Sequence, residues 1–65
     1  MEERQIALAP KYCKELVNAV TNHNLPINII VHRSHGRLKE ITLTYDERDE
    51  GLVDWIIERV ENLDL

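Results

Sequence analysis

Two runs of alternating apolar and polar residues lie on either side of a short loop in the middle of the chain. The alternating apolar residues are Ile27, Ile29 and Val31 in the first run, and Ile41, Leu43 and Tyr45 in the second. Alternation with period two is typical of strands that bury one face. The sequence therefore predicts an antiparallel β-hairpin whose apolar face has to be covered by the rest of the chain.

The segment between the two runs sets the expected register of this hairpin. A three-residue loop, 34–36, in which Gly36 takes positive φ as a bulge, keeps both apolar sets on one face. This loop pairs Arg33 with Arg37, Ile29 with Ile41 and Ile27 with Leu43. A two-residue turn of residues 35 and 36 would place Ile29 opposite Thr42 and mix the two faces, so we exclude it.

Helices are expected on both sides of the hairpin. Between Pro10 and about His23, apolar residues recur every three or four positions, which predicts an amphipathic helix. Segment 22–26 is expected to end it, because asparagine tolerates left-handed geometry and Pro26 biases Leu25 away from the helical region. A second helix is expected from about Asp46, with Asp46 or Thr44 as its cap. Its apolar stripe consists of Leu52, Ile56, Val60 and Leu63, widened by Val53 and Ile57. Trp55 falls at the far edge, so the apolar arc covers roughly 200°, more than a helix on one sheet normally buries.

The first residues add a short strand, because Ile6 and Leu8 alternate with Gln5 and Ala7 before Pro10. With this strand the order of elements is β-α-β-β-α, and without it the order is α-β-β-α. Both orders predict an α+β fold in which two helices pack on one face of a small antiparallel hairpin sheet. No repeat or linker divides the chain, so residues 1–65 are expected to form a single domain.

The size of the chain limits the stability that its core can supply. A domain of 65 residues buries only about 60% of the surface that its unfolded chain exposes. Cys13 is the only cysteine, so no disulfide within the chain can add stability, and a reducing compartment is expected. The first ten residues lack the apolar run of a signal peptide, and the uncharged run 16–32 is too polar to span a membrane. We therefore expect a cytoplasmic protein that gains stability by oligomerisation.

The candidate catalytic and metal-ligating residues do not form a recognisable site. His32 and His35 lie three residues apart across the hairpin loop, but Glu40 is the one further ligand nearby, and zinc sites use three or four. Cys13 and His23 lie about 15 Å apart along one helix at 1.5 Å per residue, so they cannot meet within one chain. The sequence therefore predicts a non-enzymatic protein with no metal and no cofactor.

The charges divide unevenly along the chain. Residues 1–45 carry six basic and four acidic side chains, a balance of +2, and residues 46–65 carry two basic and eight acidic side chains, a balance of −6. Arg33, Arg37 and Lys39 gather with His35 in segment 32–39, where they suit an anion or a nucleic acid, or simply a solvated turn. The acidic second helix suits a basic surface on a partner protein, or simply a solvated helix face.

Two functions follow from this charge layout. The first is a small interaction protein, an inhibitor, antirepressor or adaptor of the kind that phages and mobile elements encode, which binds a partner protein through its acidic C-terminal helix. The second is a nucleic-acid-binding module that uses the basic hairpin 32–39. We favour the first, because the acidic half of the chain would repel phosphates. In element order and in its acidic last helix, the chain also resembles the DNA-damage-inducible DinI-type modulators of recombinase filaments, a resemblance of shape and charge in which no motif is matched.

The expected partner-binding residues lie on the second helix and on the hairpin. Trp55 is the expected anchor, because tryptophan at the edge of an apolar stripe often carries binding energy. The expected steering charges, which form one ridge of the helix, are Asp54, Glu58 and Glu61. Ile30 and Leu38 are expected on the second face of the hairpin, offset by one pair. With Trp55 they leave more apolar surface than one sheet and two helices can cover, which predicts a homodimer or a hetero-complex.

Overall fold

The structure, a computed structural model, describes residues 1–63, and it describes His35 by its backbone alone. The elements follow one another as β1 (Glu2–Leu8), α1 (Pro10–Asn22), β2 (Ile27–His35), β3 (Leu38–Tyr45), the 3-10 helix η1 (Glu47–Asp49) and α2 (Glu50–Glu61). This order confirms the predicted α+β fold, β-α-β-β-α, and it includes the first strand.

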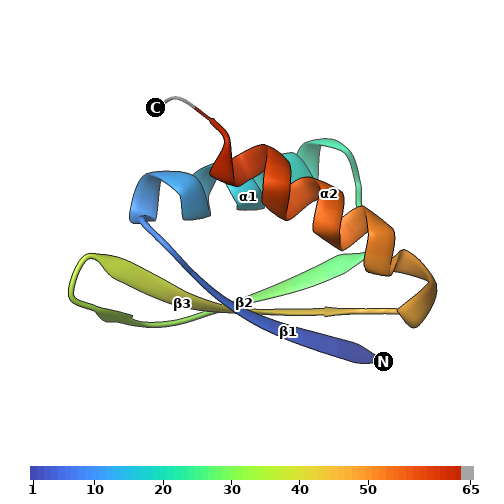
Figure 1. The fold of residues 1–65 in the computed structure, drawn as a ribbon, viewed down its shortest axis with the longest axis horizontal. Helices are drawn as coiled ribbons and strands as arrows, with labels where there is room; N and C mark the ends of the chain where they lie inside the picture. The colour runs from blue at the N-terminus through green and yellow to red at the C-terminus, as the bar shows by residue number, and fades with distance from the viewer. Residues whose placement is uncertain (64–65) are drawn as a thin grey trace.

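The sheet is open, has the strand order β1-β3-β2, and pairs β3 antiparallel with both of its neighbours. β1 and β2 therefore run parallel to each other on either side of β3, and α1 connects them. A connection between parallel strands needs a crossover of about a dozen residues or more, which α1 provides. Figure 1 shows both helices on one side of the sheet, as predicted, while the other side of the sheet is left open.

The core lies between the two helices and the covered face of the sheet. All three strands and both long helices contribute to it, with the buried residues Leu8, Cys13, Leu16, Val20, Ile27, Ile41, Leu43, Tyr45, Val53, Ile56 and Val60. Leu16 of α1, Ile41 and Leu43 of β3, and Ile56 of α2 are completely buried. The alternating residues of the second predicted run, on the central strand, therefore form the floor of the core.

The hairpin register differs from the predicted one. Ile29 lies opposite Leu43 and not opposite Ile41, and the chain turns at Gly36 and Arg37 instead of across residues 34–36. Gly36 has the expected positive φ, +62°, but it occupies the first central position of a two-residue turn. Positive φ at that position alone is the pattern of a type II′ turn, which follows the right-handed twist of a hairpin.

A β-bulge explains why this turn still buries both apolar sets. A regular ladder built from a turn at residues 36 and 37 would place Ile29 opposite Thr44 and rotate its apolar set to the wrong face. Between Val31 and Ser34, β2 has two residues opposite one residue of β3, and this extra residue shifts the register by one. The predicted three-residue loop is wrong because the bulge, and not the loop, brings the two apolar sets together.

Local hydrogen bonds end α1 as the sequence predicts. Asn24 has φ +51°, the left-handed conformation that asparagine tolerates. Its N–H donates to the carbonyl oxygen of Thr21 at 3.2 Å, and the N–H of Leu25 donates to that of Val20 at 3.0 Å. These two bonds satisfy the last carbonyls of the helix in a Schellman motif and direct the chain into β2.

Replacing Gly36 by alanine is expected to lower the free energy of unfolding by about 1–2 kcal/mol, because a side chain at positive φ is strained. A Cβ at this position meets no atom within 4 Å, so the effect comes from the backbone and not from a clash. Gly51→Ala is the matched control. Gly51 also has open space around it, but it lies in the first turn of α2, where alanine should be neutral or stabilising by up to about 1 kcal/mol. Urea unfolding measures both variants, and equal losses at the two glycines would contradict the turn geometry.

Candidate functional site

The first candidate surface is the side of α2 that faces away from the sheet. Val53, Ile56 and Val60 are buried, and Leu52 and Ile57 beside them are half-buried. The exposed residues, which we call the outer α2 face, are Gly51, Asp54, Trp55, Glu58, Arg59 and Glu61. The buried arc of this helix is therefore narrower than its apolar arc, and Trp55 belongs to the solvent-facing side together with the acidic residues.

Trp55, the single tryptophan of the chain, is 49% exposed. The guanidinium of Arg59, one turn further along α2, lies 5.5 Å from the centre of the Trp55 ring, within range of a cation–π interaction. Gly51, one turn earlier, leaves open space in place of a side chain. Tyr45 is buried in the core and Tyr12 packs against the core, partly buried, so Trp55 is more accessible to a partner than either tyrosine.

Asp54 has a partner within the chain. Arg4 of β1 donates hydrogen bonds to Asp54 and to Glu50 of α2, each at 2.5 Å. The hydrogen bond with Asp54 is the largest cause that raises the pKa of the Arg4 guanidinium, and burial opposes it. Arg4 also lies 5.9 Å from the centre of the Tyr45 ring. The predicted ridge of steering charges is therefore divided, with Asp54 tied to the sheet and Glu58 and Glu61 exposed beside Trp55.

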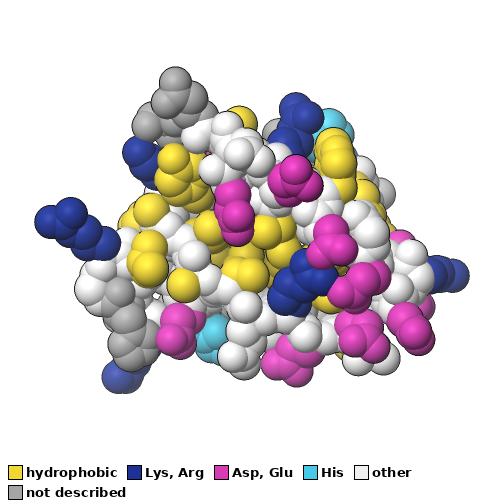
Figure 2. Space-filling model, in the orientation of Figure 1, with side chains coloured by type: hydrophobic (Ala, Val, Ile, Leu, Met, Phe, Trp, Pro, Cys, Tyr) yellow, Lys and Arg dark blue, Asp and Glu magenta, His cyan; other side chains and the backbone are white. Residues whose placement is uncertain are grey.

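An acidic end of the molecule surrounds η1. Since Glu2 pairs with Tyr45, the start of β1 lies beside the segment that leads into η1. We call this group the acidic end; its members are Glu2, Glu3, Asp46, Glu47, Asp49 and Glu50. Figure 2 shows acidic side chains gathered on the side where η1 and the start of α2 lie in Figure 1. Burial raises the pKa of the Tyr45 phenol beneath this end, so the phenol adds no charge near neutral pH.

A basic end lies at the opposite side of the molecule, around the tip of the hairpin. Its members are Lys11, Arg33, Arg37 and Lys39, because Leu8 pairs with Lys39 and α1 starts two residues later. Arg33 and Arg37 are exposed, Lys39 is half-buried, and the side chain of His35 lies outside the described part of the chain. The longest dimension of the molecule is 33 Å, and the hairpin and η1 mark its two ends in Figure 1.

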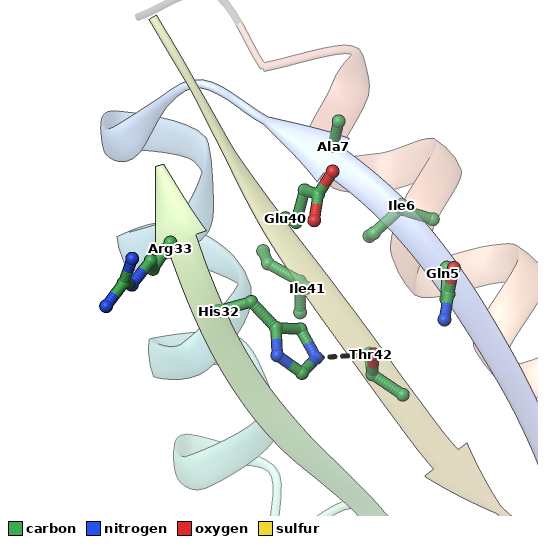
Figure 3. A pocket seen from close by; sticks show the side chains of 8 residues that line it. All are labelled: Gln5, Ile6, Ala7, His32, Arg33, Glu40, Ile41 and Thr42. Atoms are coloured by element: carbon green, nitrogen blue, oxygen red, sulfur yellow. Dashed lines mark hydrogen bonds between the residues drawn. The ribbon is translucent and has the colours of Figure 1, made fainter. Parts of the chain in front are cut away.

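The open face of the sheet carries a hollow of about 510 Å³. It is lined by Gln5–Ala7 of β1, His32 and Arg33 of β2, and Glu40–Thr42 of β3. Figure 3 shows His32 reaching across to Thr42, and the His32 Nε2 and Thr42 Oγ1 atoms share a hydrogen bond of 2.8 Å. This bond provides the buried hydroxyl of Thr42 with a partner. Among the described side chains, no three His, Cys, Asp or Glu residues gather as metal ligands.

The structure separates the three apolar residues that were expected to leave one large uncovered surface. Ile30 and Leu38 lie on the open face and are 50% and 45% exposed. Ile30 pairs with Thr42 and Leu38 pairs with His35, so their places on the sheet lie four positions apart along β3, about 13 Å at 3.3 Å per residue. The predicted offset of one pair is therefore wrong. Trp55 is on the helical side of the sheet, so these residues form no common patch.

The remaining sequence candidates are also separated. Cys13 is buried in the core, whereas His23 follows α1 as an exposed C-cap. Within residues 1–63, no helix combines the length and apolar character needed to cross a membrane. Comparisons with family models, curated proteins and solved structures found no match to this chain. The function proposed below therefore depends on the surfaces of the molecule itself.

Replacing Arg4 by glutamine is expected to lower the free energy of unfolding by about 1 kcal/mol, because Arg4 joins β1 to two carboxylates of α2 from a partly buried position. Arg48→Gln is the control, since Arg48 pairs with Asp46 at 3.8 Å and both side chains are largely exposed. That change should stay within about 0.5 kcal/mol. Thermal unfolding in low salt compares the two variants, and an equal or larger loss at Arg48 would contradict the role given to Arg4.

Proposed function

We propose that this chain is a small non-enzymatic interaction module that binds a partner protein through the outer α2 face. The observation that carries this proposal is the half-exposed indole of Trp55 beside exposed carboxylates. A domain of this size needs its large apolar side chains for the core, so an aromatic side chain that stays outside is available for binding. Tryptophan is among the residues that most often supply a large share of the binding energy at interfaces.

The neighbours of Trp55 favour binding of a flat group against the indole. A cation–π contact with Arg59 favours one orientation of the ring, which would lower the entropy lost when a partner binds. Gly51 leaves space one turn earlier, on the same outer face. A partner side chain can therefore approach the indole without displacing another residue of α2.

The acidic residues of this surface favour a partner with a basic surface. Glu58 and Glu61 are exposed on α2, and the acidic end continues the same sign of charge toward η1. Charges at the rim of an interface act mainly on the rate of association, which falls as salt screens them. The chain would then act by occupying its partner, as a cytoplasmic inhibitor, antirepressor or adaptor of phage or mobile-element type does.

A second candidate function, binding of nucleic acid by hairpin 32–39, is favoured by one observation. The basic end lies at the opposite end of the long axis from η1, which reduces the repulsion that the acidic end exerts on phosphates. The exposed Arg33 and Arg37 would contact the backbone. We place this candidate second, because segment 32–39 contains no Phe, Tyr or Trp on which a base could stack, and the net charge of the chain is −4.

Glu58→Lys tests the proposed surface. The tagged chain is used to capture its partner from an extract of the host, and association with the purified partner is then measured at several salt concentrations. Glu58→Lys should slow association severalfold and weaken its salt dependence. Glu40→Lys is the control, since it changes the net charge equally from an exposed position on the open face of the sheet. Equal effects of the two variants, or a captured partner that is a nucleic acid, would contradict the proposal.

A further inference from the structure

The two edges of the sheet differ in how they are protected against pairing with another chain. The β1 edge carries Glu2, Glu3 and Arg4, and the second half of β2 is distorted by the bulge after Val31. Charges and bulges are the devices that keep edge strands from pairing with other strands. The first half of β2, Ile27–Val31, has no charge, no proline and no bulge. We call this segment the β2 edge.

Exposed apolar side chains accompany the β2 edge on both faces of the sheet. Ile30 is half-exposed on the open face, and Val31, on the covered face, is 45% exposed. Val17 of α1 is 38% exposed, and its helical position puts it on the flank opposite Glu15 and Ala19, which line a hollow shared with α2. Arg4 ties α2 to β1, so this free flank of α1 faces the β2 side. A strand added at the β2 edge would therefore cover apolar surface as well as backbone groups.

The charge distribution identifies a second copy of this chain as the strand that fits. β2 runs from the acidic end, where Ile27 pairs with Tyr45, to the basic end, where Ser34 pairs with Lys39. If two β2 edges pair antiparallel about a two-fold axis, the hairpin tip of each copy, with Arg33, lies toward the end of the other copy where β3 leads into Asp46 and Glu47. Such pairing directs charges of opposite sign toward each other twice, as suits a self-complementary interface.

We propose that two copies pair through their β2 edges, with segments 27–31 antiparallel, and form one continuous sheet with three strands from each copy. In an antiparallel ladder alternate residues direct their N–H and C=O groups to each side, so the β2 edge supplies groups that β3 does not use. α2 lies over β1, at the far edge of each copy, and the outer α2 face remains uncovered. This inference is independent of the proposed function, and the dimer would present two outer α2 faces.

Sedimentation equilibrium at micromolar concentration tests the mass, which should be twice 7.6 kDa. Ile30→Lys places a charge at the β2 edge and should weaken dimerisation at least tenfold. Leu38→Lys is the matched control, because Leu38 lies on the same open face with similar exposure but on the central strand beyond the bulge. The Leu38→Lys variant should remain dimeric. For the wild-type chain, a higher salt concentration should weaken the dimer, because salt screens the opposite charges of the two copies. Circular dichroism checks that both variants fold.

Hydrogen exchange on the wild-type chain tests the same proposal without a substitution. Amides in segment 27–31 that point away from β3 should gain protection as the protein concentration rises, while amides of β1 should not. A monomer of 7.6 kDa throughout the micromolar range would overturn the proposal. Equal dissociation by Ile30→Lys and Leu38→Lys would also overturn it, because it would show that the open faces of two sheets stack instead.

Discussion

Trp55→Ala is expected to weaken binding of the partner by about 2 kcal/mol or more, roughly 30-fold in Kd, while the chain stays folded. The indole is half-exposed and packs against Arg59 of its own helix, so its removal opens no cavity in the core. The free energy of unfolding should therefore change by less than about 1 kcal/mol. Calorimetric titration of the partner and urea unfolding, on the same preparation, measure the two quantities.

A role of Trp55 in the core would give the opposite result. Trp55→Ala would then lower the melting temperature by many degrees and leave the affinity per folded molecule unchanged. Val53→Ala is the comparison on the same helix, since Val53 is completely buried. It should destabilise the chain by about 1–3 kcal/mol with little effect on the affinity of the folded fraction.

Leu16→Ala is expected to cause the largest loss of stability, about 3 kcal/mol or more. Leu16 is completely buried where α1 packs on the sheet, and removal of its side chain loses apolar burial and leaves a cavity. At the usual stability per residue, a chain of 65 residues has roughly 3–10 kcal/mol in total. The variant should therefore be partly unfolded at room temperature.

Leu16→Met is the control for this prediction, because methionine keeps nearly the same volume and should cost less than about 1.5 kcal/mol. Urea unfolding followed by far-ultraviolet circular dichroism measures both variants. Similar stabilities of Leu16→Ala and Leu16→Met would show that α1 does not pack on the sheet as described.

The elements of the fold could be predicted because each has a local signal. Alternation of apolar and polar residues predicted β1 and both strands of the hairpin. Pro10 marked the start of α1, and Asn24 follows the helix in the predicted left-handed conformation. Asp46 caps η1 with its side chain, one short turn before α2 begins at Glu50. The start of the acidic helical segment was therefore predicted correctly, while its first turn is a 3-10 helix.

The register and part of the candidate site could not be predicted, because they depend on cross-strand geometry. Without a bulge, a turn at residues 36 and 37 would not allow Ile29 to be buried with the apolar residues of β3. The bulge before Ser34 makes this turn possible, and no residue type in the sequence marks that bulge. The pairing of Arg4 with Asp54 joins residues 50 positions apart, and a helical wheel shows Asp54 only as one member of an acidic ridge. The separation of Ile30 and Leu38 along the sheet could not be predicted either, because it depends on the register that the bulge sets.

Nuclear magnetic resonance of the isotope-labelled chain, titrated with its captured partner, tests most directly whether α2 is the interaction surface. The largest shifts are expected at the Trp55 indole and at the amides of Gly51 and Glu58, while the open face of the sheet changes little. Largest shifts in hairpin 32–39 with an unchanged Trp55 indole would contradict the account and favour binding through the basic end.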